Sequence, residues 1–395
     1  GLICSDLSQM FSDDGMVLPQ VDEFMSQSYA NAGAIQSDGK IVAGGQSRGS
    51  GGNSVLALVR YLDDGSLDTG FGANGFVITD VGGFQDALAD LAIDSSGRIL
   101  AGGFTNDTAL GTTKFVLARY NPDGSLDTAF NETGIVTTLV GESSVGKALA
   151  IQPGDGKIIL AGSAYSDMTS YYGGFAAARY NTDGSLDTSF AGGTGWTIFY
   201  FYPALMYDFL SSMTLDDVGR IVMSGTTYPD ESFADETTQA AVARLCPDGS
   251  LDSGGVCSDS GFGGIGLLSL SIGSAGADFK SVAINPTDGS VLAGGWSVSD
   301  TQNVFTLALF EGDPPAQTIN ISGNAGAAGV TLSYMDGTAK SITSDSSGAY
   351  WISVPENWTG TVTPAKAGFT FTPTSRSYTT VAADLTDQDS RSEER

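Results

Sequence analysis

One segment of sequence recurs four times along this chain, at intervals of roughly 60 residues. Its copies occupy residues 60–71, 119–130, 179–190 and, in a shortened form, 244–252. The second copy reads Arg-Tyr-Asn-Pro-Asp-Gly-Ser-Leu-Asp-Thr-Ala-Phe. A repeat of this kind cannot bury its apolar face alone, so neighbouring copies must pack against one another. Repeats that hold several short strands are typical of radial or stacked β architectures.

A second segment interleaves with the first and occurs five times. Its first copy reads Asp-Gly-Lys-Ile-Val-Ala-Gly-Gly, and the copies occupy residues 38–45, 96–103, 155–162, 218–225 and 288–295. Each copy follows an Ala-rich apolar run and a Gly-containing turn, a pattern that indicates a tight hairpin. With a strand ending in Ala-Arg-Tyr and a strand beginning Ser-Leu-Asp, each repeat holds four antiparallel strands. We therefore predict the blades of a β-propeller, with a stacked β-solenoid as the alternative.

The number of strands predicts how the propeller closes. The first three strands of the repeat occur five times, but no Ser-Leu-Asp strand follows Phe310. Residues 6–18 match residues 66–78 at a constant offset. We therefore expect a five-bladed, all-β propeller over residues 1–312, whose fifth blade receives its outer strand from the N-terminus. That strand closes the fifth blade of its own chain or, alternatively, of a neighbouring molecule.

Four Arg–Asp pairs accompany the repeated segment. In each copy an Arg precedes an Asp by eight residues, so the two side chains face each other across the hairpin as an ion pair. The pairs are Arg60 with Asp68, Arg119 with Asp127, Arg179 with Asp187, and Arg244 with Asp252. In the fifth repeat both partners are replaced together, by Leu309 and Ser8. Joint replacement is expected of a contact pair, because a half-buried unpaired charge is costly.

The sequence changes character after the propeller repeats. Residues 313–317, with Pro314 and Pro315, indicate a stiff linker. Residues 318–389 alternate polar and apolar positions between Gly turns, a pattern typical of about seven short strands in a small β-sandwich. We expect an immunoglobulin-like domain there and a polar tail over residues 390–395.

Composition excludes several classes of function. The chain carries 45 acidic and 17 basic residues, for a net charge of −28, which disfavours nucleic acid and anionic membrane surfaces as partners. It contains no histidine, so catalysis by imidazole and metal ligation by imidazole are excluded, whereas chemistry that uses carboxylates alone remains possible. No apolar stretch is long enough for a membrane-spanning helix. We expect no cofactor, no nucleic acid partner and no membrane insertion.

The cysteines indicate an oxidising compartment. Cys246 and Cys257 flank an insertion that only the fourth repeat carries, and we expect a disulfide between them, with two free thiols as the alternative. Cys4 stays unassigned. The chain begins at Gly1 without a methionine, which a cleaved signal peptide or trimming of the chain would explain. We expect an extracellular or cell-surface location.

Two further features could bind a ligand. The Asp-Gly turns, such as residues 121–127, alternate oxygen-bearing side chains as calcium loops do. The first and fourth copies place Leu62 and Cys246 where the first ligand would stand, so we expect structural turns, with calcium as the alternative. The fourth blade contains an aromatic-rich stretch, and its Trp196, Tyr200, Tyr202 and Tyr207 are our candidates for stacking on a sugar or contacting another subunit. The alternative is that these rings fill the core.

The repeated segments resemble the bacterial delta-60 repeat, which is related in style to NHL-type propellers; the resemblance covers about residues 5–312. The C-terminal part, through residues 345–350 and 369–378, is similar to carboxypeptidase-regulatory-like, immunoglobulin-like modules of bacterial surface proteins. These resemblances imply a secreted or surface-attached protein and carry no catalytic residue onto this chain.

From these observations we expect a non-enzymatic structural protein of the cell surface that self-associates, into a filament or a surface layer. A glycan-binding adhesin, which would use the propeller loops or the aromatic residues of the fourth blade, is the first alternative. An enzyme of carboxylate chemistry is the second alternative.

Overall fold

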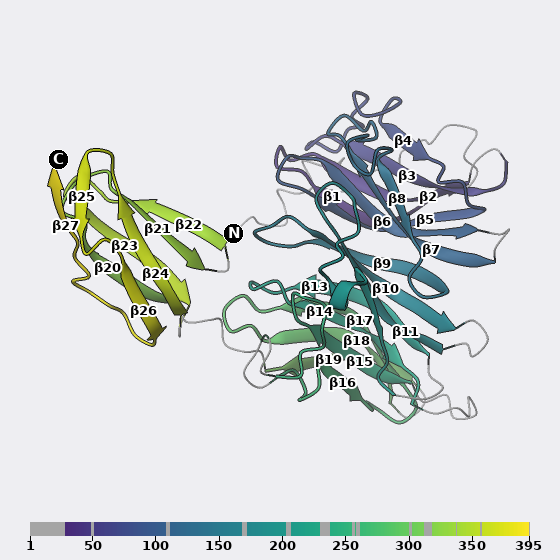
Figure 1. Ribbon diagram of the computed structural model, residues 1–395. Coiled ribbons are helices and arrows are strands. Elements are labelled where there is room, and N and C mark those ends of the chain that lie inside the picture. Colours follow the sequence, from purple (N-terminus) through teal and green to yellow (C-terminus); the bar gives the residue numbers. More distant parts are fainter. Residues whose placement is uncertain are drawn as a thin grey trace. The chain divides into compact units, whose positions relative to one another are not determined.

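The computed structural model describes residues 28–394 apart from short gaps. The gaps are residues 49–50, 108–110, 168–171, 203–206, 230–237, 255–256, 258–260, 300–301, 312–317, 337 and 356–357. The predicted N-terminal strand (residues 6–18), Ser8, Cys4 and the predicted linker therefore lie outside the described residues. The described part is all-β with one short 3-10 helix, Ala191–Gly193, and contains no helix that is long and apolar enough to span a membrane. The chain divides near residue 311 into two compact units (Figure 1).

The first unit contains antiparallel strands in successive groups, one for each repeat, which we call the first to fifth sheets. The first sheet comprises β1 (Ser28–Ile35), β2 (Ile41–Arg48), β3 (Ser54–Tyr61) and β4 (Phe76–Thr79). The second comprises β5 (Gln85–Ile93), β6 (Ile99–Asp107), β7 (Thr112–Tyr120) and β8 (Ile135–Thr138). The third comprises β9 (Ser143–Ile151), β10 (Ile158–Asp167), β11 (Tyr172–Tyr180) and β12 (Trp196–Phe199).

The last two sheets complete the series. The fourth comprises β13 (Asp208–Leu215), β14 (Ile221–Thr227), β15 (Gln239–Leu245) and β16 (Leu267–Leu270). The fifth comprises only β17 (Ala277–Ile284), β18 (Val291–Ser299) and β19 (Gln302–Phe310), so that β19 has no fourth strand beside it among the described residues. One parallel bridge, between Ser54 and Gln85, joins the first two sheets, and no described sheet closes on itself.

Successive sheets pack face to face through apolar side chains. Leu56 and Leu58 on β3 pack in one cluster with Leu88 and Leu91 on β5, and all four are at most 7% exposed. The cluster between the third and fourth sheets is larger and includes Phe175 and four further ring or thioether side chains: Phe190, Phe199, Met213 and Met223. The repeat thus buries its apolar residues against the next repeat, as its sequence predicts.

The structure explains why every copy of the second repeated segment ends in glycine. The inner strand of every sheet bulges where it pairs with the second strand, as between Leu88 and Asp90 opposite β6. A Cβ atom on Gly103 would lie 2.0 Å from the Ala87 carbonyl oxygen, and the same clash arises at the equivalent Gly45, Gly162, Gly225 and Gly295. Only glycine allows the backbones to approach so closely.

We expect Gly103→Ala to destabilise the first unit by at least about 2 kcal/mol, because the backbone of β5 must shift to accommodate the methyl group. Gly33→Ala is the matched control: it also lies on an inner strand, but its added Cβ would come no closer than 3.8 Å to another atom. Urea unfolding of both variants measures the difference. Equal stabilities would contradict the close-approach explanation.

The second unit is built from three small antiparallel groups. Strand β20 (Thr318–Asn324) pairs with β23 (Ala349–Pro355). A four-stranded group has the order β22 (Thr338–Thr343), β21 (Thr331–Asp336), β24 (Trp358–Ala365), β26 (Arg376–Val381). Strand β25 (Phe369–Thr372) pairs with β27 (Arg391–Glu394), so the residues expected as a polar tail form a strand. Trp358 lies in the core, between the rings of Tyr334 and Tyr378.

Candidate functional site

The Arg of each repeated segment is held at a junction between two sheets. Arg119 is the penultimate residue of β7, and its Nε donates a hydrogen bond to Asp127 Oδ2 at 2.8 Å. Its guanidinium lies over the Phe130 ring, 4.4 Å from the centroid. Its Nη1 donates to the carbonyl oxygen of Thr182, in the turn of the next repeat. One buried cation therefore connects its own hairpin, its own aromatic side chain and the neighbouring sheet.

The same arrangement recurs in the other three repeats. The Arg–Asp distances are 2.9 Å for Arg60 and Asp68, 2.7 Å for Arg179 and Asp187, and 2.6 Å for Arg244 and Asp252. The stacked rings are Phe71, Phe190 and Phe262. Arg60 and Arg179 also donate to carbonyls of the next repeat, at Pro122 and Pro247. The four predicted pairs therefore lie in contact, and their surroundings indicate a structural role. In the fifth sheet Leu309 stands at the Arg position and is 70% exposed.

The Asp-Gly turns are explained by hydrogen bonds within each turn. Asp123 Oδ1 accepts from the backbone N–H and the hydroxyl of Ser125, at 2.9 and 2.7 Å. The same two bonds form in the other three copies, at Asp64, Asp183 and Asp248. Hydrogen bonding to Ser125 lowers the pKa of the Asp123 carboxyl, and the equivalent bonds lower the pKa of its three counterparts. These contacts fix the geometry of the turn.

The insertion of the fourth repeat is closed by a disulfide. The sulfurs of Cys246 and Cys257 lie 2.06 Å apart, and the Cα atoms are separated by 5.6 Å. Together with Asp252 they form the one group of three ligand-type side chains found within the described ranges. Because the two sulfurs are bonded to each other, neither is a thiolate that could bind a metal. The disulfide is consistent with an extracellular location.

We expect Arg244→Leu alone to cost about 3–5 kcal/mol of unfolding free energy, because it removes the Arg244 guanidinium from the carboxylate of Asp252, whose side chain is 0% exposed. The double variant Arg244→Leu/Asp252→Ser reproduces the residue pair of the fifth repeat and should recover a large part of that loss. Urea unfolding of the two single variants and the double variant measures the coupling. Losses that simply add would show that the pair does not act as a unit.

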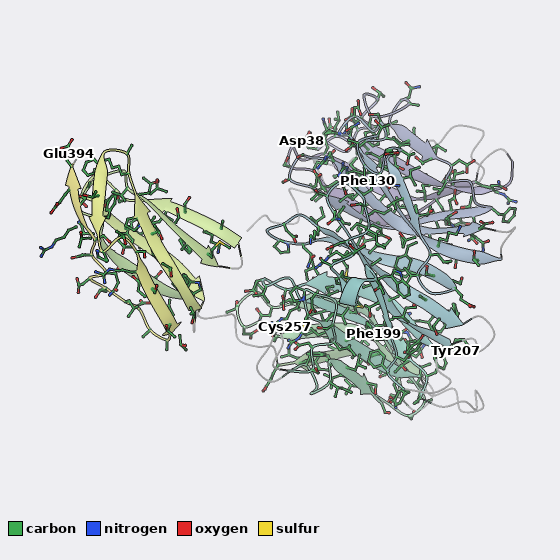
Figure 2. The ribbon with its side chains drawn as sticks, in the orientation of Figure 1. Asp38, Phe130, Phe199, Tyr207, Cys257 and Glu394 are labelled. Atoms are coloured by element: carbon green, nitrogen blue, oxygen red, sulfur yellow. A yellow bond between two sulfur atoms is a disulfide. The ribbon has the colours of Figure 1, made fainter. Side chains whose placement is uncertain are left out.

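A row of aromatic side chains lies where the third and fourth sheets meet. We define it by Tyr165, Tyr207, Phe209 and Tyr228. The ring centroids of Tyr165 and Tyr207 are 6.5 Å apart, those of Tyr207 and Phe209 are 6.2 Å apart with an interplanar angle of 4°, and those of Phe209 and Tyr228 are 6.2 Å apart. Phe209 is 43% exposed and the three tyrosines are half-buried. Figure 2 shows Tyr207 at the rim of the first unit.

Four strands of the third and fourth sheets position the row. Tyr165 lies on β10, whereas Tyr207 immediately precedes β13 and forms a parallel bridge with Gly173 of β11. Phe209 is two residues further on and lies on the same side of β13, since side chains alternate along a strand. Tyr228 follows β14 and donates its backbone N–H to the Tyr207 carbonyl at 3.2 Å. The row therefore depends on the packing of the third sheet against the fourth.

The four residues that the sequence singled out occupy different environments. Tyr207 belongs to the row. Trp196 begins β12 and packs against the core between the second and third sheets. Tyr200 is half-buried, and Tyr202 donates its hydroxyl to Gln239 Oε1 at 2.5 Å and contacts Ser269 Oγ at 2.9 Å. Phe209 could have been identified from its spacing to Tyr207, whereas Tyr165 and Tyr228 carry no signal in the sequence.

Asp208 lies between Tyr207 and Phe209 in the sequence, and its side chain is completely buried. Its Oδ2 accepts a hydrogen bond from the backbone N–H of Phe201 at 3.1 Å. Burial raises its pKa from the ordinary 3.8 to about 6. The equivalent Asp86 of the second sheet accepts in the same way from the Val81 N–H at 2.7 Å. The carboxyl thus anchors the chain that enters the inner strand, and with it the position of Tyr207.

Because the pKa of Asp208 is raised on folding, this group stabilises the fold most below pH 3.8, and that contribution is lost as the pH rises through about 6. Asp208→Asn keeps the acceptor for Phe201 but removes the titration. We expect the stability of the variant relative to the parent to increase by about 2–3 kcal/mol between pH 4 and pH 7. Chemical unfolding at several pH values measures this difference, and a difference independent of pH would contradict it.

Comparisons with known proteins agree with the repeat. A family model described as a β-propeller domain of unknown function, DUF5122, matches residues 36–71, 95–130 and 154–190. No curated protein matches the chain in sequence. A solved protein of unknown function from Dyadobacter fermentans is similar in fold, with 11% identity over 93% of this chain and 94% of that one and a TM-score of 0.39.

Two glycoside hydrolases are also similar in fold. The GH43 β-xylosidase/α-arabinofuranosidase from a compost microbial metagenome shares 11% identity, over 73% of this chain and 94% of that one, with a TM-score of 0.32. The endo-arabinase from Bacteroides thetaiotaomicron shares 12% identity, over 74% of this chain and 100% of that one, with a TM-score of 0.37. These matches contradict the expectation of a non-enzymatic structural protein, which was wrong and is not retained. At such low identity they assign no activity to this chain. The chain contains a β-propeller domain.

Proposed function

We propose that the propeller domain binds carbohydrate at the aromatic row formed by Tyr165, Tyr207, Phe209 and Tyr228. The observation that carries the proposal is the set of four neighbouring rings that remain partly exposed at the rim of the unit. Contiguous apolar patches that stay exposed on a protein surface are typical of interaction and ligand-binding sites. A saccharide presents flat C–H faces and hydroxyl edges, which such a row can accommodate.

The chemistry of the row fits an uncharged saccharide. Three of its members are tyrosines, whose rings supply apolar area while their hydroxyls exchange hydrogen bonds with the hydroxyls of a sugar. The net charge of −28 repels anionic ligands, so acidic polysaccharides and phosphorylated ligands are disfavoured. The contact between Tyr207 and Phe209, with nearly parallel rings, provides the flattest part of the surface.

We expect Tyr207→Ala and Phe209→Ala each to weaken binding of a neutral oligosaccharide about tenfold, which corresponds to about 1.4 kcal/mol. Xylotriose, the ligand named with the xylosidase described above, and an arabinan oligosaccharide are suitable probes, and calorimetry gives the affinities. Trp351→Ala is the matched control, since Trp351 is 66% exposed but belongs to the second unit.

Affinities that stay unchanged in both row variants would overturn the proposal. Failure of every neutral saccharide in a broad panel to bind the parent protein would overturn it as well. Release of reducing sugar by the parent protein, measured in the same samples, would show that the bound saccharide is also cleaved.

We further propose the finer features of the architecture. The propeller has five blades, and residues 6–18 supply the outer strand of the fifth, because β19 has no fourth strand beside it in the part of the chain that the structure describes and residues 6–18 match 66–78. The second unit is an immunoglobulin-like sandwich. The repeats are of the delta-60, NHL-like type, and the protein is secreted.

A further inference from the structure

The outward face of the fifth sheet is apolar and uncovered. Leu292, Phe305 and Leu307 are 41%, 100% and 74% exposed. Their register shows which residues correspond to them in other sheets, since Gly294 pairs with Leu307 as Gly44 pairs with Leu58. The equivalent residues of the first sheet are Val42, Leu56 and Leu58, and they are 0%, 1% and 2% exposed. The fifth sheet therefore has the side chains of a covered face without the sheet that covers it.

The outward face of the first sheet, at the opposite end of the series, is also exposed, and it carries small side chains. Ala43, Ala57 and Val59, on the outward face of the first sheet, are half-exposed. Their counterparts in the second sheet are Ala101, Val116 and Ala118, which are at most 1% exposed because the first sheet packs on them. The outward face of the first sheet is concave, with a hollow of about 430 Å³ that Phe76 and Ile78 also line. Figure 1 shows the first and fifth sheets at the two ends of the series.

The two faces are complementary, because one carries large apolar side chains and the other carries small ones. At the junction of the first and second sheets, Leu56 and Leu58 of one sheet meet the small side chains of the next. Phe305 and Leu307 would meet Ala43, Ala57 and Val59 in the same way. Leu309 extends this apolar face at the position where the other repeats carry their buried Arg, so no charge has to be buried. The fifth sheet is thus built to pack on a first sheet.

We propose that the first and fifth sheets of two different copies of this chain bind each other head to tail. Among the residues that the structure describes, neither face is covered by another part of the chain, and each face is complementary to the other, so we take the matching face of a second copy as the occupant. An interface between two different faces is heterologous, so each copy keeps one face free for a further partner.

The test uses the full chain in light scattering coupled to gel filtration, over a range of concentrations and at two salt concentrations. We expect the parent to exceed the monomer mass as its concentration rises, and to do so more readily at high salt, which screens the net charge of −28. Leu307→Glu and Val59→Glu should each be monomeric. The matched control Ile265→Glu, at a residue that is 60% exposed outside both faces, should assemble as the parent does.

A mixture of the two monomeric variants is the decisive sample. Leu307→Glu keeps an intact first-sheet face and Val59→Glu keeps an intact fifth-sheet face, so the equimolar mixture should form a dimer of one copy of each. A parent that stays monomeric at all concentrations would overturn the proposal, whether its two faces close on each other in one chain or remain free. A mixture that stays monomeric beside an assembling parent would equally overturn the pairing of these two faces.

Discussion

The buried Arg of the repeated segment is the contact on which the propeller unit depends. It neutralises an Asp in its own hairpin, stacks on an aromatic ring of its own repeat and donates to a carbonyl of the next repeat, as Arg119 does with Asp127, Phe130 and Thr182. A buried ion pair is not by itself a source of stability, because desolvation offsets most of the attraction. Its value here is geometric, since the planar guanidinium fixes the register of two neighbouring sheets at once.

The repeat made much of this arrangement predictable. The eight-residue spacing between Arg and Asp places the two opposite each other across a hairpin, and the glycine that ends each copy of the second repeated segment corresponds to Gly103, where a Cβ atom would meet a backbone oxygen. Such features repeat because each depends on local geometry. The partner of the Arg in the next repeat, a backbone carbonyl, leaves no trace in the sequence and could not be predicted.

The aromatic row was harder to predict for the same reason. Tyr207 was among the candidates because it lies in an aromatic-rich stretch, but Trp196 of that stretch packs into the core. Tyr165 and Tyr228 come from other strands and meet Tyr207 and Phe209 only because the third sheet packs on the fourth. A site assembled across a junction between repeats depends on tertiary packing that no single segment encodes. The expectation of a non-enzymatic protein was wrong for another reason. The absence of histidine excludes catalysis by imidazole, but it does not exclude catalysis by carboxylates.

The repeats and the uncovered end faces indicate that every sheet of the propeller unit has side chains suited to packing against another sheet. Hydrogen exchange of the full chain, followed by mass spectrometry over a dilution series, tests this account most directly. The account predicts that amides of β19, residues 302–310, are protected at high protein concentration and lose protection on dilution, while those of β15 stay protected throughout. Protection of β19 that does not change with concentration would contradict coverage by a second copy.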